Sequence, residues 1–218
     1  MKIKVCGLKD PANLQAILEL PIDMAGFIFY PKSPRFAESK ALRVWIDKNP
    51  SAFGKVEKVG VFVNAEIEYV LNTVHDYHLD YVQLHGAESP EYCRELISYW
   101  SIGSLRSAKF IKAFQVTPAF DFEETERFEG LCSYFLFDAH GEQPGGNGVS
   151  FDWHKLEEYK GITPFLLSGG ISEQDAETIR HINVKSLWGV DINSKFETKP
   201  GIKDPEKVAN FVKALKDE

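Results

Sequence analysis

The chain repeats one pattern of hydrophobic and polar positions about eight times. A short apolar run is followed by a loop and then by a segment in which apolar residues recur at helical spacing. This alternation predicts parallel strands that are connected by helices. The predicted strands are Ile3–Cys6, Met24–Tyr30, Lys58–Val63, Tyr81–His85, Phe110–Gln115, Tyr134–Asp138, Phe165–Ser168 and Ser186–Ile192.

Several of the intervening segments carry helix start signals. Asp10-Pro11 and Asp204-Pro205 each place a capping residue before a proline, which is typical of a first helical turn. The predicted helices are Asp10–Leu20, Ser39–Lys48, Ala65–Tyr77, Ser89–Tyr99, Phe122–Phe128, Asp152–Tyr159, Ser172–His181 and Asp204–Lys216. No segment between them is typical of a linker, so we expect a single domain over residues 1–218.

Eight strand–helix units match the number that closes a (β/α)8 barrel. A doubly wound open sheet is the alternative, but its central strands would be apolar on both faces. The fourth predicted strand is not: Val82 and Leu84 face one way, while Gln83 and His85 face the other. We therefore expect an apolar face toward the helices and a second face toward the barrel lumen, ending in polar residues.

The last strand has the same parity. Trp188, Val190 and Ile192 are assigned to the apolar face, opposite Gly189 and Asp191. Together with the eight units, this parity predicts an α/β fold of the (β/α)8 TIM-barrel class.

Composition narrows the possible partners. A net charge of −7 argues against nucleic acid or an anionic membrane surface as the main partner, so any anionic ligand must be held by local positive groups. We expect a cytoplasmic location, because no segment is typical of a signal peptide or long enough to span a bilayer. Cys6, Cys93 and Cys132 form no CxxC pair and have no histidine at ligand spacing, so we expect no metal site. We interpret Cys93 and Cys132 as packing residues in helical segments.

Polar side chains end several predicted strands or follow them. They are Cys6, Arg35, His85, Asp138 and Asp191. Because the carboxyl ends of barrel strands form one mouth, these side chains would converge where barrel active sites lie. Each also has an ordinary alternative: a buried thiol, a solvated arginine, a structural histidine or a loop-capping carboxylate.

Cys6 and Asp138 suit acid–base chemistry. Lys4 and Cys6 share the strand face opposite Ile3 and Val5. A thiol needs help to become a thiolate near pH 7, and Lys4 is a candidate, unless it only pairs with an interior carboxylate. Asp138 would need burial or a nearby negative charge to keep a proton for donation. Such a pair could move protons in an isomerase without a cofactor.

Loops after three strands could hold a small phosphorylated anion. The stiff loop Pro31-Lys32-Ser33-Pro34-Arg35 presents an arginine suited to a carboxylate. Gly169-Gly170 precede a predicted helix, where backbone N–H groups bind phosphate without net positive charge. TIM barrels frequently bind phosphate in the loops after strands seven and eight. Asn193-Ser194, after the eighth strand, are therefore further candidate phosphate contacts. The loop Gly145–Gly148 is either a further contact or only flexible.

Many of these stretches resemble the phosphoribosylanthranilate isomerase family of the tryptophan pathway, over essentially the whole chain. The matching stretches are Lys4–Leu8, Gly26–Arg35, Val59–Asn64, Val82–Gly86, Phe137-Asp138, Gly145–Gly148, Phe151–Trp153, Leu167–Ile171, Gly189–Asn193 and Pro200–Asp204. The resemblance implies a barrel of the ribulose-phosphate-binding type and an Amadori rearrangement of N-(5-phosphoribosyl)anthranilate to the 1-deoxyribulose 5-phosphate product, without a cofactor. We expect a monomer or homodimer.

The resemblance also implies roles for individual residues. The family's general base falls on Cys6 and its general acid on Asp138. Its contact to the anthranilate carboxylate falls on Arg35, and the residue near the amine and sugar hydroxyls falls on Asp191; we add His85 as a substrate-binding candidate. The implied phosphate contacts are Gly146, Gly148, Gly169, Gly170, Asn193 and Ser194.

Three departures from the family pattern concern loop geometry and affinity. Asn147 replaces a serine, Lys195 replaces a glycine after the eighth strand, and the loop Ala139–Pro144 matches no family motif. The alternatives are a related phosphate-binding barrel, such as the histidine-pathway isomerase or tryptophan synthase α, and a barrel that binds a phosphorylated ligand without chemistry. The histidine-pathway isomerase would be expected to carry a carboxylate at position 6, and a barrel that only binds its ligand would not need both Cys6 and Asp138.

Overall fold

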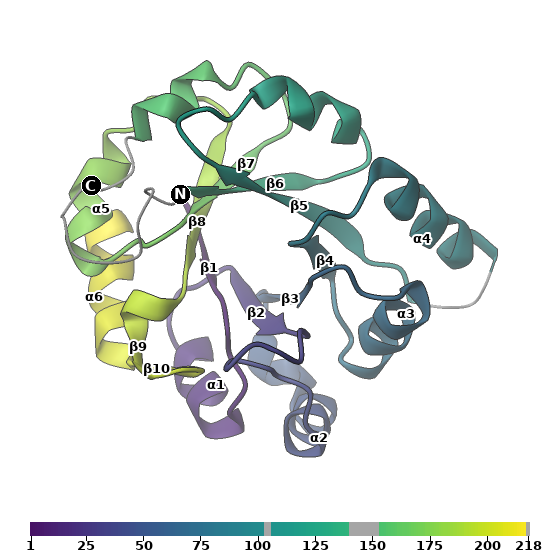
Figure 1. Ribbon diagram of the computed structural model, residues 1–218. Helices are drawn as coiled ribbons and strands as arrows, with labels where there is room; N and C mark the ends of the chain where they lie inside the picture. Colours follow the sequence, from purple (N-terminus) through teal and green to yellow (C-terminus); the bar gives the residue numbers. More distant parts are fainter. Residues whose placement is uncertain (103–105, 140–152, 217–218) are drawn as a thin grey trace.

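Eight parallel strands close into a barrel in the computed structural model, which describes residues 1–102, 106–139 and 153–216 (Figure 1). Each strand pairs with its neighbours in sequence, and β1 pairs with β8 to close the ring. The strands are β1 (Lys2–Val5), β2 (Met24–Ile28), β3 (Glu57–Phe62), β4 (Tyr81–Leu84), β5 (Lys109–Val116), β6 (Tyr134–Ala139), β7 (Phe165–Ser168) and β8 (Leu187–Ile192). The predicted (β/α)8 barrel is confirmed.

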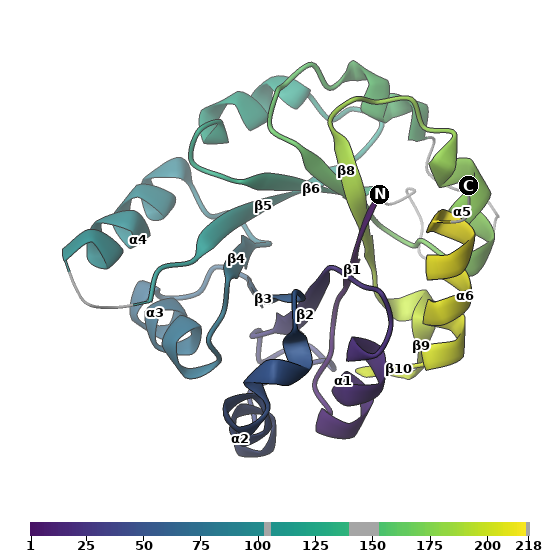
Figure 2. The same ribbon diagram turned by 180° about the vertical axis from the view of Figure 1, so that it is seen from behind.

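Helices surround the barrel (Figures 1 and 2). They are α1 (Pro11–Leu18), α2 (Lys40–Lys48), α3 (Ile67–Asp76), α4 (Pro90–Ile102), α5 (Ala176–Arg180) and α6 (Pro205–Lys216). The Asp10 side chain accepts a hydrogen bond from the Asn13 amide at 2.9 Å, as its predicted capping role requires. No helix in the described ranges is long and apolar enough to cross a lipid bilayer.

Some segments predicted as α-helices are 3₁₀-helices instead. Phe122–Phe128 is one, and its buried residues Phe122, Thr125 and Phe128 recur every three positions. That spacing aligns side chains in a 3₁₀-helix, which has three residues per turn. A second lies at Trp153–Glu158, within the predicted helix Asp152–Tyr159.

The segment after β7 and the segment after β8 also differ from expectation. The predicted helix Ser172–His181 divides into a 3₁₀ turn at Glu173–Asp175 and the five-residue α5. After β8, a 3₁₀ turn and an unpredicted hairpin of β9 (Glu197–Lys199) and β10 (Ile202–Lys203) precede α6. The 3₁₀ turn after β8 is Ser194–Phe196, and a further one lies at Pro50–Phe53.

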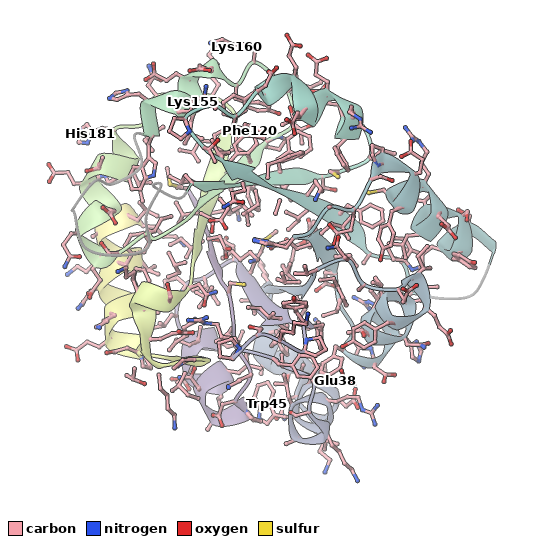
Figure 3. All side chains as sticks on the ribbon, in the orientation of Figure 1. Glu38, Trp45, Phe120, Lys155, Lys160 and His181 are labelled. Carbon is pink, nitrogen blue, oxygen red and sulfur yellow. The ribbon has the colours of Figure 1, made fainter. Side chains whose placement is uncertain are left out.

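The apolar core has two layers, one inside the barrel and one between the strands and the helices. Figure 3 shows side chains directed both into the ring and outward from it. Ile3, Val5, Val82 and Leu84 belong to the outer layer, as their parity predicts. The inner layer consists of Met24, Val59, Tyr81, Ile111, Ala113, Leu136 and Leu166, with Tyr134 and Trp188 packed against them.

Trp188 is therefore on the opposite face from the one predicted. The register between β7 and β8 shifts, so that Phe165 is opposite Leu187 but Leu166 is opposite Gly189. The extra residue in β8 resets the alternation and turns Trp188 into the lumen. There its ring stacks on Tyr134, with centroids 4.1 Å apart.

The two cysteines outside the mouth are buried, in agreement with a packing role. Cys93 lies on α4 as predicted, but Cys132 lies just before β6 rather than in a helix. Each thiol shifts the pKa of the other, so the two side chains are neighbours.

Truncating the inner layer should cost considerable stability. Leu136 is fully buried there, so we expect Leu136→Ala to lower the free energy of unfolding by about 2–5 kcal/mol. Urea unfolding measures this loss. Ile162→Ala is the matched control, because Ile162 is 86% exposed and its truncation should change stability by less than about 0.5 kcal/mol. Equal losses in the two variants would contradict the assignment of the inner layer.

Candidate active site

A cavity of about 270 Å³ lies at the carboxyl ends of the strands. Eight of the predicted site residues line it: Cys6, His85, Asp138, Gly169, Gly170, Asp191, Asn193 and Ser194. The other lining residues, which the sequence did not single out as site residues, are Ile28, Tyr30, Ser33, Val61, Val63, Gln83, Ser168 and Ile171. Gly146 and Gly148 lie outside the described residues. The barrel thus gathers residues from distant parts of the sequence at one mouth.

Cys6 directly follows β1 and is 4% exposed. Its amide donates a hydrogen bond to the Ile192 carbonyl at 2.9 Å, which ties the residue to the end of β8. Below it on the same strand face, Lys4 lies close to the thiol and places its Nζ 2.8 Å from Asp191 Oδ1. Lys4 and Asp191 are register partners on β1 and β8, so strand pairing itself brings the two charges together.

The surroundings of Cys6 act on its pKa in opposite directions. Burial raises the pKa of the thiol and Asp191 adds to the rise, while Lys4 and Lys203 partly oppose it. For Lys4, burial alone would favour the neutral amine, but Asp191 and Cys6 raise its pKa above the ordinary value. A charged ammonium therefore lies beside a thiol that is protonated at neutral pH.

Asp138 lies on β6 and approaches the cavity from another part of the ring. His85 Nε2 is 3.5 Å from Asp138 Oδ2, and His85 Nδ1 is 2.8 Å from Gln83 Nε2. Gln83 is almost fully buried below His85, on the lumen face that its parity predicts. The arrangement links the two strands β4 and β6 through a histidine whose orientation the Gln83 amide fixes.

The glycine pair after β7 presents free amide groups to the cavity. Gly169 and Gly170 have φ of +105° and +66°, values suited to glycine. A Cβ on Gly169 would clash with the Ala139 carbonyl, whereas a Cβ on Gly170 would meet nothing within 4 Å. The amides of Gly169, Gly170 and Ser194 donate no hydrogen bond to any described residue. Backbone N–H groups of residues that line one cavity can hold an anion such as phosphate.

The expected helix N-terminus contributes less than predicted. The Ser172 amide donates to Asp175 Oδ2 at 2.7 Å in a capping box, and α5 has only five residues. An anion at this point would therefore be held by the loop amides before the cap rather than by the terminus of a long helix.

Arg35 lies beside the cavity and is paired with a residue that the sequence did not single out. Its Nε and Nη2 donate to the carboxylate of Glu197 at distances of 2.7–3.1 Å. Glu197 also accepts from the buried Lys203 Nζ at 2.7 Å. Lys203 lies in the stretch Pro200–Asp204 noted above, and Glu197 lies just before that stretch. No local spacing relates either residue to Arg35.

No group of three or more His, Cys, Asp or Glu side chains in residues 1–102, 106–139 and 153–216 is arranged to hold a metal ion. The chemistry available to these residues is that of a thiol, a carboxyl group, a histidine and an ammonium group around one cavity. Together with the loop amides, this arrangement is suited to moving protons on a small anionic ligand.

Comparison with known proteins identifies relatives over the whole barrel. Residues 3–214 match the family described as N-(5'-phosphoribosyl)anthranilate (PRA) isomerase. The N-(5'-phosphoribosyl)anthranilate isomerase of Parabacteroides distasonis is 45% identical over 99% of this chain and 93% of its own length.

Solved structures of phosphoribosylanthranilate isomerases are also similar to this chain. A phosphoribosyl anthranilate isomerase in complex with reduced 1-(o-carboxyphenylamino)-1-deoxyribulose 5-phosphate is 29% identical, with a TM-score of 0.81 and full coverage of both chains. Monomers made from the dimeric enzyme of Thermotoga maritima are 28% identical, with a TM-score of 0.76 and full coverage of both chains.

The glycine pair offers a matched test of the anion site. Gly169→Ala should displace the loop and abolish stabilisation by inorganic phosphate, because its Cβ would overlap the Ala139 carbonyl. Gly170→Ala should keep phosphate binding. Its free energy of unfolding should fall by only about 1–2 kcal/mol, because alanine is strained at a left-handed backbone position. The thermal midpoint at increasing phosphate concentration measures both effects. Phosphate stabilisation that is equal in wild type and Gly169→Ala would refute the site.

Proposed function

The chain belongs to the N-(5'-phosphoribosyl)anthranilate isomerase family, and we propose that Cys6 and Asp138 are the general base and general acid of its reaction. The reaction is the Amadori rearrangement of N-(5-phosphoribosyl)anthranilate to 1-(2-carboxyphenylamino)-1-deoxyribulose 5-phosphate in tryptophan biosynthesis. The observation that carries the proposal is the position of both residues on one cavity, at the ends of β1 and β6. Around the ring, β1 and β6 are separated by three strand positions in one direction and by five in the other. The two groups therefore approach a ligand from different sides.

Asp138 acts first in this proposal. Its carboxyl proton passes to the ribose ring oxygen, the bond from C1 to that oxygen breaks, and the anthranilate nitrogen lone pair forms a C1=N iminium ion. Asp138 is left as a carboxylate. His85, 3.5 Å away, is placed to stabilise the negative charge that develops there.

Cys6 reacts as the thiolate, having released its thiol proton to solvent beside the cationic iminium ion, and then removes the proton from C2. The electrons of the C2–H bond form a C1=C2 double bond and neutralise the iminium nitrogen, which gives an enolamine. Movement of the hydroxyl proton from O2 and protonation of C1 yield the ketone. The cationic iminium supports this step, because a nearby positive charge makes the C2 proton more acidic and favours the thiolate. Lys4 adds a fixed positive charge beside the thiol.

The remaining site residues hold the substrate in the proposal. The amides around Gly169-Gly170 and Asn193-Ser194 bind the phosphate, with Gly146 and Gly148 as further contacts. Asp191 has one oxygen on Lys4 and the other 3.4 Å from Ser168 Oγ, at the cavity wall, where it holds the substrate amine and sugar hydroxyls. His85 also contacts substrate, and Arg35 binds the anthranilate carboxylate.

We also propose that the enzyme acts in the cytoplasm without a cofactor, as a monomer or homodimer. Proton transfers alone complete the rearrangement, since the product is an isomer of the substrate. The Thermotoga maritima enzyme is described as dimeric, which supports the second of the two assembly states.

Replacing either proton-transfer residue should remove most activity without unfolding the barrel. We expect Cys6→Ser and Asp138→Asn each to lower kcat by about 10²–10⁴-fold, the usual contribution of general acid–base catalysis. Loss of substrate fluorescence measures the rate. Cys93→Ala is the matched control, because Cys93 is buried away from the cavity and its loss should leave kcat near normal. A folded Cys6→Ser or Asp138→Asn variant with near-normal kcat would overturn that residue's role.

Removing the ammonium beside Cys6 should make the thiol less acidic. Lys4 lowers the pKa of Cys6, and without Lys4 the charge of Asp191 would raise it further, so both effects of Lys4→Met have the same sign. We expect alkylation of Cys6 by iodoacetamide at pH 7 to slow and its pH profile to move to higher pH, as measured by peptide mass spectrometry. Lys4→Arg, which keeps the charge, should shift the profile less. An unchanged profile in folded Lys4→Met would exclude Lys4 from activation of the thiol.

A further inference from the structure

The carboxylate of Glu197 lies between two cations at the edge of the mouth. Oε1 accepts from Arg35 Nε at 2.9 Å, from Lys203 Nζ at 2.7 Å and from the Gly201 amide at 3.0 Å. Oε2 accepts from Arg35 Nε at 3.1 Å and from Arg35 Nη2 at 2.7 Å. The Glu197 side chain is only 4% exposed. A buried carboxylate with so many short partners has one well-defined position.

The cluster of Arg35, Glu197 and Lys203 is continuous with the anion-binding loop. Lys203 is fully buried, and its Nζ also donates to Asn193 Oδ1 at 2.7 Å and to the Asn193 carbonyl at 3.2 Å. Asn193 precedes Ser194, and both residues line the cavity. Two cations on one carboxylate leave a net charge of +1, although the whole chain carries −7.

The stem of Arg35 passes close to the proposed base. A Cβ on Gly7 would lie 2.8 Å from Arg35 Cδ and 2.7 Å from Asn193 Oδ1. Only a glycine, here with φ of +78°, lets these two side chains pack on the backbone next to Cys6. Arg35 is therefore within the mouth although it does not line the cavity itself.

Glu197 occupies one edge of the guanidinium group. The bonds use Nε and Nη2, while Nη1 donates to no described residue. Because the guanidinium is planar, holding that edge fixes the plane and directs the remaining N–H groups. A carboxylate can then be bound by the adjacent edge, formed by Nη1 and the second N–H of Nη2, without the entropy cost of ordering a flexible arginine.

We propose that Glu197 is a positioning residue that sets the enzyme's preference for a carboxylate on the substrate's aromatic ring. It orients Arg35 for that carboxylate, and Lys203 supplies the positive charge that keeps the cluster attractive to an anion. The inference rests on the proposed role of Arg35. A residue that only stabilised the fold would affect ligands with and without the carboxylate equally.

Binding of two matched ligands separates these possibilities. The first ligand is reduced 1-(o-carboxyphenylamino)-1-deoxyribulose 5-phosphate, and the second is the same compound without the carboxylate. We expect Glu197→Gln to weaken the first about 10-fold by calorimetry, and Glu197→Ala to weaken it more, because Gln still accepts one hydrogen bond from Arg35. The Kd of the second ligand should stay within about 2-fold of wild type for both variants.

Steady-state kinetics should show the same selectivity. In Glu197→Gln we expect KM for N-(5'-phosphoribosyl)anthranilate to rise while kcat changes little, because the reacting atoms keep their partners. Equal weakening of both ligands, or no weakening of either, would overturn the positioning role.

Variants of Arg35 distinguish failure of this inference from failure of the proposed function. If Arg35→Ala weakens only the carboxylate-bearing ligand while folded Glu197 variants do not, the positioning role fails and the Arg35 assignment stands. If Arg35→Ala leaves both ligands unchanged, the Arg35 assignment itself fails. Should Glu197→Gln not fold, Arg35→Lys provides the test: its ammonium keeps the charge but not the fixed edge, so selective weakening is expected and wild-type affinity would contradict the geometry.

Discussion

The ion pair between Lys4 and Asp191 inside the barrel is the interaction on which the site depends. Two charged groups removed from water cost several kcal/mol each unless they meet closely, and here they are 2.8 Å apart with side-chain exposures of 0% and 5%. The register of β1 against β8 makes them neighbours, so barrel closure creates the pair. The pair in turn places an ammonium under Cys6 and leaves one Asp191 oxygen at the cavity wall.

An acidic protein can hold a doubly anionic ligand because its local fields differ from its net charge. The loop amides after β7 and β8 supply partial positive charge, and the cluster of Arg35, Glu197 and Lys203 supplies a full one. Asn193 belongs to both features, since it bonds to Lys203 and precedes Ser194. In our account, the segment after β8 therefore connects the binding site for the phosphate with the binding site for the carboxylate.

Strand parity was enough to predict the barrel and most of its mouth, because a period of two places alternate residues on the same face for as long as the strand stays regular. It put Lys4, Cys6 and Gln83 in the lumen correctly. The face predicted for Trp188 was wrong, because an extra residue in β8 resets the alternation. No local sequence pattern indicates this bulge.

The partner of Arg35 could not be predicted, because Glu197 is 162 residues away and only the folded loops bring them together. A spacing of three also occurs in α-helices, so the pattern of Phe122–Phe128 does not distinguish an α-helix from the 3₁₀-helix found there. Parity and motif therefore indicate where side chains gather, whereas the ion pairs that orient them depend on the three-dimensional course of the loops.

Deuterium at C2 of the ribose tests the two proton-transfer roles most directly. We compare kcat for protiated and C2-deuterated N-(5'-phosphoribosyl)anthranilate in Cys6→Ser and in Asp138→Asn. If Cys6 removes the C2 proton, the Cys6 variant is limited by that step and shows a large primary isotope effect. The Asp138 variant is limited by ring opening and shows almost none. A large effect in Asp138→Asn together with none in Cys6→Ser would contradict the assignment of base and acid.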